Sequence, residues 1–247
     1  MLPSQRAEFD IPREVCYLNA ASWSPLPLKT RAAGRAGVDR KVRPWTLDPN
    51  LGAQQHERAR RAAAALINAD PGDVALISSV SYGVATAGKV LPVPAGSRVL
   101  LLQDDHTSPV LEWLGRAEAQ RFSTEIVPRP EDGDWTAALL AAIGRTGTPP
   151  VGLASISSVH WADGGAIDLD AVSAALRAQG ANLLVDATHG AGVMPIDVRR
   201  IDPDFLVFPT YKWVLGPYGR AFLYVAKRWQ NGVPIEQASS GRRAIAS

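Results

Sequence analysis

A single lysine, Lys212, follows a predicted buried strand at residues 205–208 and enters a turn rich in glycine and proline. Tyr211 and Trp213 flank it. Because burying an ammonium group is costly, a partly buried lysine has a lowered pKa, and its neutral amine can attack a carbonyl carbon to form an imine. In the alternative interpretation, the stem of Lys212 covers apolar surface while its charged end stays in water. The stretch alone leaves both interpretations open.

Two other polar groups could act together with such a lysine. The run at residues 78–81, Ser-Ser-Val-Ser, enters a predicted helix. It is either an ordinary N-cap or an anion site at a helix N-terminus, which suits a phosphate. Asp186 follows an apolar run, and it either caps a turn or is a partly buried carboxylate that needs a cationic partner. The chain has no GxGxxG and no GxxxxGK[ST] sequence, so the usual signatures of dinucleotide and nucleoside-triphosphate binding are absent.

Short apolar runs alternate with helical patterns from residue 74 onward, and they must position these groups. They predict strands at 74–77, 98–102, 124–127, 151–156, 182–185, 205–208 and 221–225. Helices are predicted from about residue 28, over 51–68, over 82–90, after 108–109, over 135–143 and over 170–178. This alternation is typical of an α/β domain with a mostly parallel seven-stranded sheet and helices on both faces.

Polar residues follow five of these strands, at the edge where ligands of open α/β sheets gather. Three of the four histidines of the chain lie among them. A lone histidine is usually structural, and His106 and His160 could lie on the surface, but five polar groups at one predicted edge indicate a site. The groups are Ser78 to Ser81; Asp104, Asp105 and His106; Ser157, Ser158, His160 and Trp161; Asp186, Thr188 and His189; and Thr210, Tyr211 and Lys212.

A phosphate-binding helix start, a strand-end aspartate and an imine-forming lysine have one economical interpretation, which is pyridoxal 5'-phosphate (PLP). The lysine would form the imine, and the helix start would hold the phosphate. The carboxylate of Asp186 would pair with the pyridine nitrogen and keep the ring cationic, which makes the ring an electron sink.

Residues 185–192, 203–205 and 211–219 resemble the class V aminotransferase family, which includes cysteine desulfurases, isopenicillin N epimerase and kynureninase. The similarity spans about residues 15 to 230. It implies a PLP-dependent transferase large domain of fold type I over residues 25–230, preceded by a segment, 1–24, that covers the site. Residues 231–247 would be an irregular tail where the family has a small C-terminal domain. The resemblance also implies a homodimer with its sites near the interface.

The resemblance assigns roles residue by residue. Lys212 would carry the internal aldimine and move the proton at the substrate Cα, Asp186 would pair with the pyridine nitrogen, and His106 would stack on the ring. The other implied contacts are His189 and Trp161 near the phenolic oxygen, Val80, Ser81, Thr210 and Tyr211 at the phosphate, and Asn19 and Ala20 near the substrate carboxylate.

Composition narrows the function classes. The net charge of +2 over 247 residues does not suggest nucleic acid or a membrane surface as a partner. The chain has no membrane-length apolar run and no signal-peptide core at its start, so we expect a cytoplasmic protein. No metal is expected. The single cysteine, Cys16, lies far from the region where family members place the desulfurase nucleophile, so desulfurase chemistry is not expected.

These observations support three hypotheses. The first is a PLP-dependent enzyme that acts on a small-molecule substrate, an amino acid or related amine, by transamination, epimerisation or β-elimination, which the sequence does not distinguish. The second is a truncated or degenerate chain that binds PLP, or only packs with a partner, without turnover. The third, a dinucleotide-binding α/β protein, rests on fold class alone.

Overall fold

The computed structural model describes residues 3–236. Its helices are α1 (Leu28–Arg40), α2 (Leu51–Leu66), α3 (Val80–Val90), α4 (Thr107–Gln120), α5 (Trp135–Ile143), α6 (Leu169–Ala178) and α7 (Val198–Ile201). Its strands are β1 (Val74–Ile77), β2 (Arg98–Leu102), β3 (Ser123–Val127), β4 (Val151–Ser157), β5 (Asn182–Asp186), β6 (Phe205–Pro209) and β7 (Ala221–Val225). Every predicted strand is present, with ends that differ by at most one residue.

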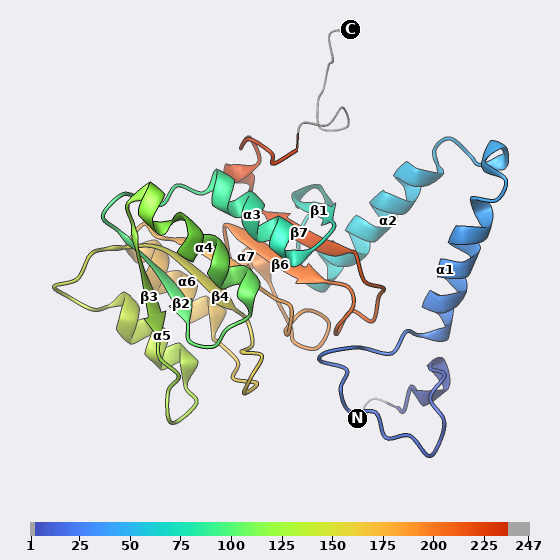
Figure 1. The fold of residues 1–247 in the computed structure, drawn as a ribbon, viewed down its shortest axis with the longest axis horizontal. Helices are drawn as coiled ribbons and strands as arrows, with labels where there is room; N and C mark the ends of the chain where they lie inside the picture. The colour runs from blue at the N-terminus through green and yellow to red at the C-terminus, as the bar shows by residue number, and fades with distance from the viewer. Residues whose placement is uncertain (1–2, 237–247) are drawn as a thin grey trace, which may run out of the picture.

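The strands form one sheet in the order β1-β7-β6-β5-β4-β2-β3 (Figure 1). Strands β3, β2, β4, β5 and β6 are parallel to their neighbours. Strand β7 runs antiparallel to both β6 and β1, so the other described strands all share one direction. The polar segments that follow β1, β2, β4, β5 and β6 therefore lie at the same edge of the sheet.

Apolar side chains of the sheet alternate between two cores, as the period of two along a strand requires. Along β2, Val99 and Leu101 pack in the core under α3 and α4, and Leu100 and Leu102 pack in the core under α2, α5 and α6. Helices thus cover both faces, and the predicted mostly parallel α/β fold is confirmed. The short helix α7 was not predicted, because four residues are too few to show a helical period.

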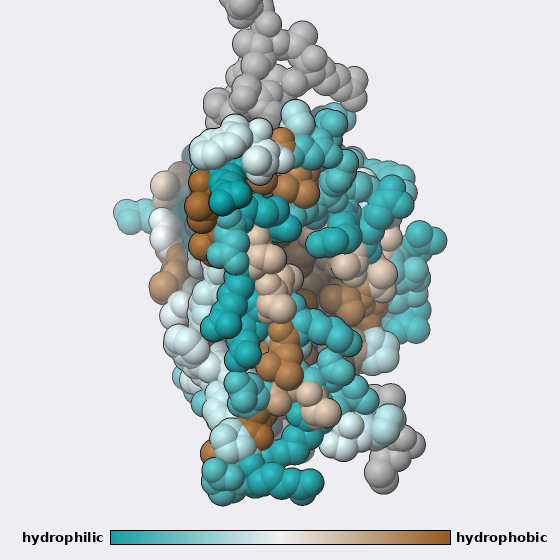
Figure 2. All heavy atoms as spheres, turned by 90° about the vertical axis from the view of Figure 1, so that its right-hand side faces the viewer, coloured by the Kyte–Doolittle hydropathy of each residue, from teal (hydrophilic) through white to brown (hydrophobic). Residues whose placement is uncertain are grey.

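The N-terminal segment that contains α1 is more exposed than the rest of the structure. Helix α1 extends away from the sheet (Figure 1), and none of its residues is buried. Figure 2 shows this side of the molecule, where apolar atoms form a strip between hydrophilic ones. Val38, Val42 and Trp45 are each more than two-thirds exposed. A 13-residue helix with Gly34 and Gly37 and no buried face is not expected to be stable without a partner.

Within residues 3–236, the helices lack the combined length and apolar character that crossing a membrane requires.

Candidate active site

The carboxyl edge of the sheet brings together charged side chains from three loops. Strand register pairs Ser157 with Asp186 at the ends of β4 and β5. Lys212 follows β6 in the next position along the sheet, and its Nζ lies 2.9 Å from Nε2 of His189 in the loop after β5. His106 and Asp105, in the loop after β2, interact electrostatically with Lys212 and Asp186, respectively. Residues far apart in the sequence therefore form one polar cluster.

Lys212 lies inside the protein, with 7 % of its surface exposed. Burial lowers the pKa of its amine, and the negative charge of Asp186 partly opposes that shift. The ring of Tyr211 has its centroid 6.0 Å from Nζ. The alternative in which the charged end of this lysine reaches into water is wrong. The partial burial of the amine favours its neutral form, as a nucleophilic lysine requires.

His189 is the direct partner of the lysine. Burial, and then the positive charges of Lys212 and His106, lower the pKa of its imidazole to about 4. The ring is therefore neutral near pH 7, and its Nε2 can accept the hydrogen bond that the Lys212 ammonium donates. This neutral acceptor holds the amine in place without adding a second charge.

Asp186 supplies a buried carboxyl group beneath this pair, with 1 % of its surface exposed. Its Oδ1 accepts a hydrogen bond of 2.9 Å from the backbone N–H of Thr188. Its Oδ2 is buried and has no hydrogen-bond partner among residues 3–236. Burial raises the pKa of this carboxyl to about 6, against the opposing effects of Thr188 and Lys212. Since buried polar atoms are almost always paired, an orphaned carboxylate oxygen suits a ligand that carries a cationic N–H donor.

The start of α3 provides the candidate phosphate site. The Ser79 hydroxyl caps the helix by accepting from the Tyr82 backbone N–H at 3.1 Å. Val80 and Ser81 are the first two helical residues, whose backbone N–H groups have no intrahelical partner. The Ser81 hydroxyl lies 2.9 Å from that of Ser108, which joins the starts of α3 and α4. Free N–H groups and two hydroxyls at one place match an anion.

The other predicted contacts are less direct. The hydroxyl of Thr210 donates to backbone carbonyls of its own turn, those of Pro217 and Arg220, so its proton is not directed at a ligand. Tyr211 stacks on Tyr218 with ring centroids 4.0 Å apart. The indole N–H of Trp161 donates to the Asp104 carbonyl at 2.5 Å, and the residue is 53 % exposed.

The N-terminal loop meets the site through Tyr211. Its carbonyl oxygen accepts hydrogen bonds from Ser24, from Oγ at 2.9 Å and from the backbone N–H at 3.3 Å. Asn19 is exposed, and its carbonyl closes a turn with Ser22 and Trp23. Ala20 is half-buried. The loop that holds Asn19 and Ala20 is therefore tied to the residue before Lys212.

Sequence reasoning gave no role to Asp105 or Ser157 and left His160 as a possible surface residue. The Asp105 carboxylate accepts from the Ser157 hydroxyl at 2.6 Å and from the His106 backbone N–H at 2.7 Å. His160 is wholly buried, so the surface interpretation is wrong. A serine that ends an apolar strand beside a predicted acidic turn is the signal that could have indicated this contact.

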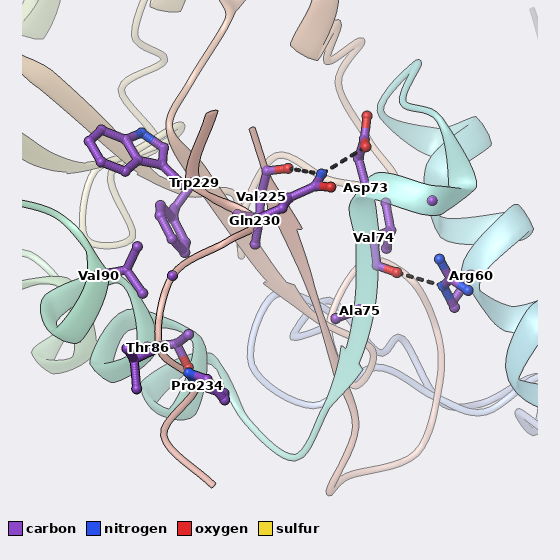
Figure 3. Close-up of a pocket in the computed structure, with 14 residues that line it drawn as sticks. Arg60, Asp73, Val74, Ala75, Thr86, Val90, Val225, Trp229, Gln230 and Pro234 are labelled. Atoms are coloured by element: carbon purple, nitrogen blue, oxygen red, sulfur yellow. Dashed lines mark hydrogen bonds between the residues drawn. The ribbon is translucent and has the colours of Figure 1, made fainter. Parts of the chain in front are cut away.

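A hollow lies at the opposite edge of the sheet, where β6 begins (Figure 3). Its volume is about 490 Å³, and Val90, Phe205 and Val225 line it. Its polar groups are already paired: Arg60 donates to the Val74 carbonyl, and Gln230 donates to Asp73. The length of β6, roughly 13 Å at the usual rise per strand residue, separates this hollow from the loop that carries Lys212. It is not part of the cluster around Lys212.

Gly192 fixes how closely the His189 and Lys212 loops approach. Its φ is +97°, and a Cβ there would lie 2.7 Å from the Trp213 carbonyl oxygen. We expect Gly192→Ala to destabilise the protein by about 1–3 kcal/mol in urea unfolding, because it adds a clash to an unfavourable φ. Gly219→Ala is the matched control, since Gly219 also has a positive φ, +79°, but no atom within 4 Å. Equal losses in the two variants would show that the close approach contributes nothing.

A buried lysine with a histidine partner lies with an orphaned carboxylate at the carboxyl edge of a doubly wound sheet, so the chain is an α/β protein with a polar site at that edge. Residues 49–244 match the model described as Aminotransferase class-V, and the chain belongs to that family.

Three curated relatives illustrate the range of activities in the family. A probable cysteine desulfurase of Methanothermobacter thermautotrophicus is 28% identical over 87% of this chain and 54% of its own length. The kynureninase of Deinococcus radiodurans is 29% identical over 92% of this chain and 55% of its own. The isopenicillin N epimerase of Streptomyces clavuligerus is 31% identical over 68% of this chain and 42% of its own length. The chain spans about half the length of the curated relatives it matches.

Solved structures agree on the fold. The apo cysteine desulfurase of Thermococcus onnurineus superposes with a TM-score of 0.78 at 20% identity, over 92% of this chain and 57% of that one. A mutant of the C-DES protein with glycine covalently linked to its PLP cofactor gives a TM-score of 0.79 at 22% identity, over 97% of this chain and 66% of that one. The fold is that of the large domain of PLP-dependent transferases of fold type I, as predicted.

Proposed function

We propose that the chain is a PLP-dependent enzyme of the class V aminotransferase type, which acts on an amino acid and binds its cofactor covalently through Lys212. The observation that supports this most is the buried Lys212–His189 pair beside an Asp186 oxygen that no described residue satisfies. Membership in the family and the fold support it as well.

The residues present fit the cofactor. Asp186 Oδ2 would accept from the protonated pyridine nitrogen, a partner that offsets the burial of its carboxylate. His106 would face the ring, and the N-terminus of α3 at Val80 and Ser81 would hold the phosphate. Tyr211 would add to the phosphate contacts, whereas Thr210 would have to turn its hydroxyl away from the carbonyls it now contacts.

Bound PLP supplies an electron sink that stabilises negative charge at the substrate Cα. The chain's own residues then control the proton. Lys212, once its amine is free of the cofactor, would take the proton from Cα and return it, and burial favours the neutral amine that this step needs. His189 and Trp161 would lie near the phenolic oxygen, and Asn19 and Ala20 near the substrate carboxylate. The face to which the proton returns, and the fate of the amino group, would separate transamination, epimerisation and elimination.

A second candidate function is PLP binding without turnover. The observation that favours it is that two predicted cofactor contacts are already engaged within the protein: the Thr210 hydroxyl donates to the Pro217 carbonyl, and the Trp161 indole donates to the Asp104 carbonyl. We further propose that the active form is a homodimer, because the exposed helix α1 and its apolar strip need a partner (Figure 2). A second copy of the chain would supply that cover, as the family resemblance implies.

A spectral titration tests the proposal. We expect the purified chain to turn yellow with PLP, to absorb in the visible region, and to change spectrum with some members of a panel of amino acids. Light scattering of the same sample reports whether it is a dimer. A protein that is colourless after incubation with PLP and removal of the free cofactor refutes the proposal. A yellow protein with no turnover of any amino acid supports binding without turnover.

A further inference from the structure

We propose that His160 is a positioning residue: together with Ser157 and Trp161 it holds the turn at residues 103–106, and through that turn it sets where the ring of His106 lies relative to Lys212. The consequence for catalysis rests on the proposed function. The positioning itself is a property of the chain alone and can be measured without a cofactor.

The turn at residues 103–106 is not self-supporting. Asp104 has φ +56°, in the left-handed region that costs a residue with a side chain roughly 1–2 kcal/mol. The backbone bond across it, from the Asp105 N–H to the Leu102 carbonyl, is long at 3.4 Å. His106 is the N-cap residue of α4, and its side chain makes no capping hydrogen bond. The conformation must therefore be stabilised by contacts from outside the turn.

The segment after β4 provides those contacts, one for each of three successive turn residues. The carbonyl of Gln103 accepts from His160 Nε2 at 2.9 Å. The carbonyl of Asp104 accepts from the Trp161 indole at 2.5 Å. The carboxylate of Asp105 accepts from Ser157 Oγ at 2.6 Å, and its Oδ1 also accepts from the backbone N–H of the next residue, the histidine. These hydrogen bonds therefore hold the backbone of His106 in a fixed position relative to the segment after β4.

His160 is the most buried of the three residues whose side chains contact the turn. It has no exposed surface, and its ring stacks on that of Trp135 with centroids 4.6 Å apart. Its Nδ1 lies 3.2 Å from Asp163 Oδ1, and no hydrogen bond joins these two atoms. Asp163 is itself held by Arg129 at 2.9 Å and by the Trp135 indole at 3.1 Å. By contrast, Trp161 is half exposed. His160 touches the turn and not Lys212, so its role is positional.

Histidine NMR of the cofactor-free protein tests the proposal. Burial, and then the charge of Lys212, lower the pKa of His106 below 6.5, and Asp105 opposes the shift. In His160→Leu the turn loses its buried donor, and we expect the His106 pKa to rise toward 6.5 as the ring meets water. Because Gln can present an N–H to the Gln103 carbonyl, His160→Gln should restore the wild-type value. Ser158→Ala, at a buried neighbour whose hydroxyl has no hydrogen-bond partner among the described residues, should leave it unchanged.

Trp161→Phe keeps the test decisive if the leucine variant does not fold, since it removes the donor to Asp104 from a half-exposed ring. A smaller rise in the His106 pKa is expected there. In the PLP-loaded enzyme, we expect His160→Leu to lower kcat roughly 10- to 100-fold with a smaller change in KM, as misplaced groups do. An unchanged His106 pKa in the folded variants overturns the proposal. A shifted pKa in a protein that never binds PLP would uphold it and remove only the proposed function.

Discussion

Replacing Lys212 with alanine is expected to abolish covalent attachment of PLP and to lower turnover by about 10³-fold or more. In the proposed function the buried amine is both the point of attachment and the group that moves the Cα proton, and a positioned acid–base group alone contributes roughly 10²- to 10⁴-fold. The measurement is borohydride reduction of the loaded protein followed by peptide mass spectrometry. The reduced cofactor should be found on the peptide that contains Lys212 in the wild type and should be missing in the variant.

Lys227→Ala is the matched control, because Lys227 is exposed and lies beyond β7, away from the carboxyl edge. That variant should retain attachment and activity at wild-type levels. His189→Gln keeps a hydrogen-bond acceptor near the amine and should preserve attachment while altering its spectrum. Fixation of the cofactor on another lysine, or undiminished fixation in Lys212→Ala, would contradict the assignment.

The strands and the edge at which the site lies could be predicted from the sequence, because both depend on local patterns. Apolar runs such as 205–208 and 182–185 are buried on two faces, and the polar residues after them must then share one edge. Strands β4 and β5 each end one residue later than predicted, at Ser157 and Asp186. These polar residues still belong to the strands because their backbones pair in the sheet.

The burial and the hydrogen-bond partners of individual side chains could not be predicted, because they depend on packing between distant segments. Nothing near His160 in the sequence indicates that Trp135 and Gln103 enclose its ring. The Lys212–His189 pair needs two loops to approach, which Gly192 permits. Thr210 looked available for a phosphate, but its hydroxyl closes its own turn. All of the proposed site roles remain predictions, namely those of Lys212, Asp186, His106, His189, Thr210, Tyr211, Val80, Ser81, Trp161, Asn19 and Ala20.

Replacing Asp186 with asparagine is expected to stabilise the cofactor-free protein above pH 6 and to weaken PLP binding. The folded-state pKa of this carboxyl, about 6, exceeds the ordinary value of 3.8. The folded protein therefore binds more protons than the unfolded chain between these values, so stability falls as pH rises through this range. Above pH 6 the full penalty applies, up to about 3 kcal/mol at 1.36 kcal/mol per pKa unit. Asparagine has no charge to bury and can still accept from Thr188.

Urea unfolding of the cofactor-free wild type and Asp186→Asn at pH 4.5 and 7.5 measures this penalty. The contributions of the other titrating groups cancel in the difference between the two free energies of unfolding. The advantage of Asp186→Asn should grow with pH. Asp204→Asn is the contrasting control: that carboxylate is also buried, but Arg228, Trp229 and the Leu183 N–H satisfy it, so its loss should destabilise.

Asp186→Asn should also bind PLP about 30-fold or more weakly than the wild type, because removing one partner of a buried charge pair costs roughly 2–5 kcal/mol. A carboxylate that lowers the stability of the empty protein and raises its affinity for a cationic ring is best explained as part of a binding site. If Asp186→Asn lost stability at every pH and bound PLP as tightly as the wild type, Asp186 would be a structural residue and the cofactor assignment would lose its central support.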